Sequence, residues 1–223
     1  MSEYLVEWCV KEKRTYLKNR IELKLAALYL EVGEPSVSIK IIDPILIEVR
    51  KADDKLLLVE LYLLESKINY HIKNYAKAKA SLTASRANAN NVYCQPSILA
   101  EIDLVSGILY AHEQDYKTAY SYFYEALEPL IAAHDLRSVN CFKYMILCKI
   151  MTNNKDDVNS LLNGKFGLKY SLDSHIQAIK EVAEAHFSSS IVALSTVFKK
   201  YHSEIEGDEV VKNHTKLLYD NLL

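Results

Sequence analysis

The sequence predicts an all-α protein built as a stack of antiparallel helical hairpins. Apolar and long side chains recur at spacings of three and four residues, which is the pattern of amphipathic helices. Short polar breaks interrupt this pattern about every 18 to 20 residues and mark turns between helices. The chain holds only five glycines and four prolines, too few for the many turns of an all-β chain.

The periodic segments give the expected helices in chain order. They lie at 14–32, 36–51, 54–73, 75–91, 96–113, 116–133, 136–152, 156–163, 172–187, 189–204 and 208–222. Pro44 falls inside the second segment and lacks the amide hydrogen that an interior helical residue donates. That helix is therefore expected to kink at Pro44, or to restart with Asp43 as its cap.

Polar clusters between the helices are interpreted as caps and turns rather than catalytic groups. The acid pairs at 53–54 and 156–157 stand where helices begin, where a carboxylate meets the positive end of the helix dipole. The serines at 188–190 can accept hydrogen bonds from the free amides of a starting helix. The segment "NGKFG" at 163–167 lacks the spacing and the terminal Lys-Ser/Thr of a phosphate-binding loop. We predict turns there and in "EIEGDE" at 204–209.

A repeat appears when the chain is shifted by 41 residues against itself. The segment "NYAKAKASL" from Asn74 then aligns with "DYKTAYSYF" from Asp115. The alignment pairs Tyr75 with Tyr116, Ala78 with Ala119, and Leu82 with Phe123. The same shift aligns Gly33, Val37 and Ile41 of a weaker first copy with Asn74, Ala78 and Leu82. We therefore predict three copies of a helix-turn-helix unit.

The best copy resembles the tetratricopeptide signature. It holds Gly107-x-x-Tyr110 and Ala119-x-x-x-Phe123, with twelve residues from Gly107 to Ala119. The small residues let two antiparallel helices approach closely, and Tyr110 and Phe123 fill the space beside them. The same pair one repeat earlier is Ser66 and Ala78. Because the period exceeds the usual 34 residues or so, helices longer than those of the standard repeat are expected.

The stretch 115–128 is rich in aromatic residues. At about 100° per residue, one apolar arc holds Tyr116, Ala119, Tyr120, Phe123 and Leu127, as in a packed helix. A platform for stacking bases would pair its aromatics with a basic groove, whereas the charges here are acidic. Tyr124 lies at the edge of the arc. Tyr122 points well away from it, which makes Tyr122 a candidate for a partner surface.

Composition argues against several classes of partner. With 27 basic and 29 acidic residues and a pI near 6.4, no overall field attracts a nucleic acid or an anionic membrane. No apolar run reaches the length of a membrane span, and the N-terminus lacks a signal-peptide pattern. We therefore expect a soluble intracellular protein that binds neither nucleic acid nor membrane.

No catalytic or metal-binding pattern stands out. The four cysteines are far apart and are expected to be reduced, apolar core residues. His175 and His186 could share a helix face, but no carboxylate or cysteine is placed to complete a metal site with them. No serine lies in a nucleophile elbow. The prediction is a protein without catalytic activity, cofactor or small-molecule substrate.

The segment from Lys11 to Lys24 carries a local excess of positive charge, six basic residues against two acidic ones. Two interpretations stay open: a solvated helix face, and a docking strip for an acidic protein surface. The candidate partner-binding residues of such a strip are Lys11, Lys13, Arg14 and Lys18.

Several blocks of the chain resemble one family. They are "EWCVKEKRTYLK" (7–18), "DDKLLLVELYLLESK" (53–67), "YCQP" (93–96), "DYKTAYSYFYEA" (115–126), "KYMILCKIM" (143–151) and "KLLYDNLL" (216–223). Together they resemble the family of the proteasome lid subunit known as non-ATPase regulatory subunit 11, nearly throughout the chain. The second subunit of the COP9 signalosome is a weaker match.

The resemblance implies a non-catalytic scaffold of the 26S proteasome lid, in the cytoplasm and nucleus. The fold it implies is a right-handed solenoid of helical hairpins at 1–153, followed by the helical part of a PCI module at 154–223. The partners it implies are other lid subunits, the ATPase ring and the core particle.

Members of this family continue into a winged helix that the present sequence lacks. The chain is therefore expected to be a fragment or a shortened member. Leu217, Leu218, Leu222 and Leu223 form an apolar stripe that a winged helix would cover. The stripe is expected to be exposed here and to favour self-association.

Two other readings stay open on the sequence. One is a stand-alone tetratricopeptide adaptor that holds a peptide in its concave groove. The other is an RNA-associated PCI protein, which the balanced charge does not favour.

Overall fold

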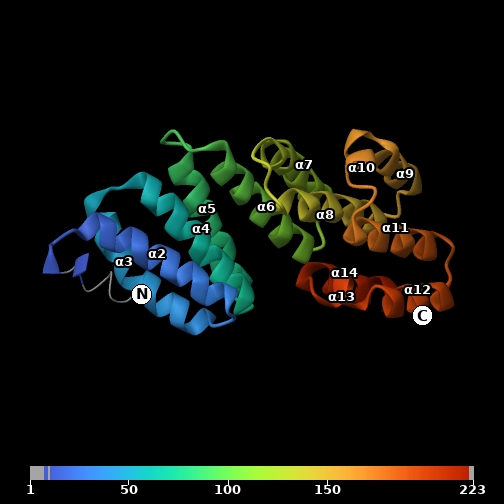
Figure 1. The fold of residues 1–223 in the computed structure, drawn as a ribbon, viewed down its shortest axis with the longest axis horizontal. Coiled ribbons are helices and arrows are strands. Elements are labelled where there is room, and N and C mark those ends of the chain that lie inside the picture. Colours follow the sequence, from blue (N-terminus) through green and yellow to red (C-terminus); the bar gives the residue numbers. More distant parts are fainter. Residues whose placement is uncertain (1–7, 10, 221–223) are drawn as a thin grey trace. The chain divides into compact units, whose positions relative to one another are not determined.

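The computed structural model describes residues 8–9 and 11–220, and this part of the chain contains helices and no strands (Figure 1). The all-α prediction is confirmed. The helices are α2 (Thr15–Glu31), α3 (Pro35–Ala52), α4 (Lys55–His71), α5 (Tyr75–Ala89), α6 (Pro96–His112), α7 (Tyr116–Ala132), α8 (Arg137–Met151), α9 (Lys155–Asn163), α10 (Lys165–Lys169), α11 (Ser174–Phe187), α12 (Ile191–Lys200), α13 (His202–Glu206) and α14 (Glu209–Asp220).

The chain forms two compact units, Met1–Val105 and Ser106–Leu223, and the border between them falls within α6. In the first unit, α2 packs on α3 and α4 on α5, and α2 and α3 both contact α4. The core of this unit is aliphatic, with Ile42, Ile45 and Leu61 almost completely buried. Burial of these side chains stabilises the hairpins against each other.

In the second unit, α8 is the central helix. It packs against α7, α9, α11 and α14, and α11 also packs against α12 and α13. Phe142 and Met145 of α8 are fully buried, as is Phe123 of α7. The predicted domain border at 153/154 falls inside this unit, and it stays a prediction.

The turns of the hairpins share one backbone conformation. Each has a residue with positive φ just before the next helix: Gly33, Lys73, Gln114, Asn153 and Ser189. The amide of the following residue bonds back across the end of the preceding helix, as Asp115 N does to Tyr110 O (3.0 Å). Asn74, Asp115 and Ser190 then cap the next helix with their side chains. The residue with positive φ ends one helix and the capping side chain begins the next, and together they define the hairpin turn.

Pairs of small residues lie twelve positions apart across the first three hairpins. Ser38 Oγ donates to the carbonyl of Ala26 at 2.7 Å, and Ser66 Oγ donates to that of Ala78 at 2.8 Å. In the third hairpin, a Cβ atom added to Gly107 would lie 2.5 Å from the ring of Phe123. Close helix approach therefore depends on small residues here.

The first copy of the repeat lies one residue away from its expected register. Ser38 is fully buried at the position of Ala78, whereas Val37 was expected there. Similarly, the buried residue equivalent to Leu82 is Ile42, in place of the expected Ile41. The interval between the first two turns is one residue shorter than between the next two, which explains the shift.

Three local predictions are wrong. Helix α3 continues through Pro44, so the alternative in which a helix restarts with Asp43 as its cap is wrong, and a kink at Pro44 stays a prediction. The 163–167 segment is not only a turn, since α10 begins at Lys165. Gly167 permits this helix because a Cβ there would collide with the carbonyl of Leu162. The expected helix 189–204 is divided at Tyr201 into α12 and α13.

Candidate protein-interaction surfaces

The predicted basic strip is only partly available to a partner. Lys18 is half-buried, and its Nζ lies 3.4 Å from Glu48 and 3.8 Å from Glu22. The Arg14 guanidinium lies 5.8 Å from the ring of Trp8. Lys11 and Lys13 are exposed. Contact with an acidic surface thus remains a prediction, and Lys18 would have to leave its own carboxylates to take part.

The aromatic residues of α7 divide between its two faces. Phe123 is fully buried, and Tyr122 is half-buried with its ring stacked on Tyr110 at 5.4 Å. Residue 110 of the preceding helix thus covers part of Tyr122, and the role of Tyr122 in a partner surface stays a prediction. Tyr124 is the exposed aromatic, with 57% of its surface accessible.

Tyr116 lies under α14. Its ring meets the His214 ring edge-on at 5.7 Å, and its hydroxyl is buried without a protein hydrogen-bond partner. Burial raises the pKa of Tyr116 to about 12, with a smaller contribution from Cys148. Tyr116 is therefore a packing residue that stays neutral.

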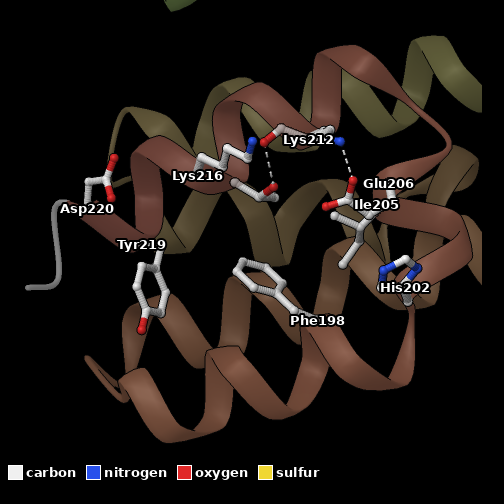
Figure 2. A pocket seen from close by; sticks show the side chains of 9 residues that line it. Phe198, His202, Ile205, Glu206, Lys212, Lys216, Tyr219 and Asp220 are labelled. Carbon is white, nitrogen blue, oxygen red and sulfur yellow. Dashed lines mark hydrogen bonds and ion pairs between the residues drawn. The ribbon is translucent and has the colours of Figure 1, made fainter.

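A groove of about 330 Å³ lies between α12, α13 and α14 (Figure 2). Phe198 of α12 and Tyr219 of α14 face each other across it, with ring centres 6.4 Å apart. Ile205 of α13 adds a third apolar wall. Sequence reasoning did not find this groove, because its walls come from three helices whose packing no spacing reveals.

The rim of this groove carries charges of both signs. Lys212 forms an ion pair with Glu206, and hydrogen bonding to Lys212 holds the pKa of the exposed Glu206 carboxyl below its usual range. Lys216 and Asp220 stand one turn apart on α14 beside them. Because these charges nearly balance, the rim does not select an occupant by charge.

Two of the four residues of the predicted apolar terminal stripe lie within the described part of the chain. Leu218 is 1% exposed and Leu217 is half-buried, while Leu222 and Leu223 lie outside the described residues. The exposure expected of Leu218 was wrong, because α14 packs that side chain inside the second unit. A partner contact at this end stays a prediction.

Two buried polar contacts hold α14 in place. Asp208 precedes α14, and its carboxylate accepts from Tyr144 (2.9 Å) and forms an ion pair with Lys143 (2.5 Å). The other carboxylate oxygen of Asp208 accepts from the amides of Val210 and Val211. Farther along α14, the His214 Nε2 lies 3.0 Å from the carbonyl oxygen of Ala111. No sequence spacing could have found these partners, because they lie 64 to 103 residues apart.

The first unit has a groove of its own, of about 310 Å³, between α2, α4 and the start of α6. Leu63 and Leu64 form part of its floor and are buried. Lys67 and Glu101 form an ion pair at its edge. The charges of Lys67 and Glu101 therefore neutralise each other at this edge.

No clustered chemistry accompanies these surfaces. Within the described ranges, no group of three His, Cys, Asp or Glu side chains could hold a metal ion. The four cysteines are buried free thiols, and burial raises the pKa of Cys148 to about 12. His175 and His186 share α11, and burial lowers the pKa of His186.

No helix in the described part of the chain has the length and hydropathy needed to cross a membrane.

Comparison with known proteins gives one consistent result. Residues 1–32 match the model of the 26S proteasome regulatory subunit RPN6 N-terminal domain. The chain is 43% identical to 26S proteasome non-ATPase regulatory subunit 11 of Dictyostelium discoideum, over 98% of the chain and 53% of that protein. It is 46% identical to the Arabidopsis thaliana homolog of that subunit, over 98% of the chain and 52% of the relative. It is 42% identical to Saccharomyces cerevisiae 26S proteasome regulatory subunit RPN6, over 99% of the chain and 52% of the relative.

These alignments confirm the expected resemblance along nearly the whole chain. The chain spans about half the length of the curated relatives it matches.

Proposed function

We propose that this chain, whose sequence is similar to 26S proteasome non-ATPase regulatory subunit 11 along nearly all its length, is a non-catalytic scaffold of the proteasome lid. In this role it supports assembly of the lid with the base and the core particle, and through them ubiquitin-dependent protein degradation. The observation that carries the proposal is the 42 to 46% identity over at least 98% of the chain to three relatives with proteasome names.

The fold supports such a role physically. Stacked hairpins give extended surfaces whose shape is fixed by packing, and such surfaces suit protein partners. The small pairs at 26/38 and 66/78 and the buried contacts of α14 hold the helices of each unit rigidly. A scaffold of this kind acts by presenting residues in fixed positions, and it needs no catalytic group.

The proposed partners are other lid subunits, the ATPase ring and the core particle. The proposed compartments are the cytoplasm and the nucleus, where proteasomes work. We further propose that residues 1–153 act as the tetratricopeptide-like arm and residues 154–223 as the helical part of a PCI module. The relatives named above are regulatory or non-ATPase subunits, and this supports a role without catalysis.

Affinity purification tests this function. The chain, with a small tag, is expressed in its native cells, and gently prepared extracts are separated by size before mass spectrometry. We expect the tagged chain in very large particles together with lid and ATPase subunits. Recovery of the chain only as a free monomer would contradict the proposal. A tagged variant with Gly107→Trp, which cannot close its third hairpin, serves as the control that should leave these particles.

A further inference from the structure

The outward side of α7 is a solvent-exposed face that the predicted repeat did not explain. Its five residues, Lys117, Ser121, Tyr124, Glu125 and Glu128, are all exposed. At about 100° per residue they fall within an arc of roughly 100°. We call these residues the α7 outer face.

Tyr124 is held in position on this face despite its exposure. Its ring stacks on that of Tyr120, with centres 6.3 Å apart and planes 26° apart. The Lys149 ammonium lies 4.3 Å from the centre of the Tyr120 ring, and Lys149 is itself held by Asp157 at 2.7 Å. A ring fixed in this way loses little freedom on binding, which favours its use as an anchor for a partner.

The two carboxylates beside it are unfavourably placed for the stability of α7. Glu125 and Glu128 are three residues apart, so they repel each other on one helix face. Both lie in the second half of α7, which ends at Ala132, so Glu128 comes near the negative end of the helix dipole. Neither forms an ion pair with another described residue. A cationic partner would relieve both costs.

We propose that the α7 outer face binds a basic protein segment through an arginine side chain. The guanidinium would lie on the exposed face of Tyr124, where the electron-rich ring attracts a cation. Its N–H groups would donate to the Glu128 carboxylate one turn away, and a second basic residue of the segment would pair with Glu125. Arginine suits this site better than lysine because it both stacks and donates in a planar fork.

The charges of the face disfavour a nucleic acid as occupant. Phosphates would meet two unpaired carboxylates here, and nucleic-acid binding requires basic residues along the backbone. Lys117 lies two turns before Tyr124, at the other end of the face. The binding site is therefore the half formed by Tyr124, Glu125 and Glu128.

Fluorescence anisotropy with labelled peptides tests this site on the 223-residue chain. The probes are hexa-arginine, hexa-lysine and hexa-glutamate. We expect hexa-arginine to bind more tightly than hexa-lysine, and hexa-glutamate not to bind. Tyr124→Ala should weaken hexa-arginine binding by about threefold, as expected for an exposed cation–π contact. Tyr124→Phe keeps the ring and should bind like the wild type.

The carboxylates are tested with a matched pair of substitutions. The double variant Glu125→Gln and Glu128→Gln should weaken hexa-arginine binding by roughly fivefold, in line with the loss of two exposed ion pairs. The control is Glu31→Gln with Glu34→Gln, which are also exposed, three residues apart and outside the α7 outer face. Circular dichroism verifies that every variant is folded.

The proposal is overturned if the control pair weakens binding as much as the α7 pair, because binding would then follow net charge alone. It is also overturned if Tyr124→Ala binds hexa-arginine like the wild type, or if hexa-arginine does not bind at all. The measurement uses the isolated chain, so a negative result leaves the proposed proteasome role intact.

Discussion

Lys143 and Asp208 form an ion pair that ties the middle of α8 to the start of α14. Only 2% of the Lys143 side chain is exposed, and 14% of that of Asp208. Lys143 also reaches Asn140 at 3.1 Å, and Asp208 accepts from Tyr144. The charges thus have additional hydrogen-bond partners, which a buried ion pair needs to be tolerated.

Breaking this pair should destabilise the second unit strongly. Asp208→Asn would leave the Lys143 ammonium buried without a counter-charge, which costs about 3 to 5 kcal/mol in comparable pairs. The double variant with Lys143→Met should recover much of this loss, because no unpaired charge then remains. Urea unfolding measures both. Equal stability of Asp208→Asn and the wild type would show that the pair does not hold α14.

The contact between Gly107 and Phe123 predicts a steric effect. Gly107→Ala would place a methyl group 2.5 Å from the Phe123 ring, so the ring or one of the two helices must shift. Overpacking of this kind costs about 1 to 3 kcal/mol. Adding Phe123→Leu should restore part of the lost free energy of unfolding. Thermal unfolding of the single and double variants checks this. If Phe123→Leu gives no recovery in the Gly107→Ala background, the steric explanation fails.

The Cys148 thiol predicts a loss of stability in alkaline solution. Its pKa is raised to about 12 by burial, against about 8.5 in an unfolded chain. As the pH rises above the unfolded value, the unfolded chain ionises and the folded chain does not. The contribution of the buried Cys148 thiol to stability is therefore complete at a pH below the unfolded pKa. It is lost progressively as the pH rises from the unfolded pKa toward the folded pKa. Tyr116 adds a similar loss, beginning above its own unfolded pKa of about 10.

Chemical denaturation at about pH 8 and about pH 10 measures this effect. The free energy of unfolding should fall less in Cys148→Ala than in the wild type. In the native protein, Cys148 should also resist thiol reagents until the chain unfolds. Rapid modification of Cys148 in the folded chain would contradict its burial.

The basic strip predicts a charge effect on assembly. The double variant Lys11→Glu and Lys13→Glu reverses two exposed charges. The new carboxylates would repel an acidic partner and lower the affinity of the chain for it. Co-purification with lid subunits should therefore decrease and become less sensitive to salt. The control reverses Lys40 and Lys51, two exposed lysines of α3. Unchanged assembly in the strip variant, or an equal loss in the control, would dismiss the strip.

The local features of the fold were predictable from the sequence because they arise from local physics. The helical period, caps such as Asp54 and Ser190, and the small residues at positions 66 and 107 can each be recognised from residues nearby in the sequence. The 41-residue shift failed in the first copy because the interval between the first two turns is one residue shorter than the next. The shift therefore assigned the buried position to Ile41, whereas Ile42 occupies it. Gly167 was mistaken for a turn residue although it permits the close approach of α10.

The surfaces were harder to predict, since they depend on contacts between distant segments. The stacking of Tyr122 on Tyr110 and the burial of Leu218 come from the packing of neighbouring helices. Whether a side chain on the border of an apolar arc is covered depends on the helix beside it, and helical angle alone does not tell. Tyr124 was placed correctly at the edge of its arc, but its partners Tyr120 and Lys149 could be seen only in three dimensions.

The contact of His214 with Ala111 spans 103 residues and joins the last described helix to the end of α6. An open array of repeats can lose its terminal hairpins one at a time, because each touches only its neighbours. Here α14 contacts the beginning of the second unit. Residues 106 to 220 should accordingly melt as one cooperative block, and closing so large a loop should make this block slow to refold.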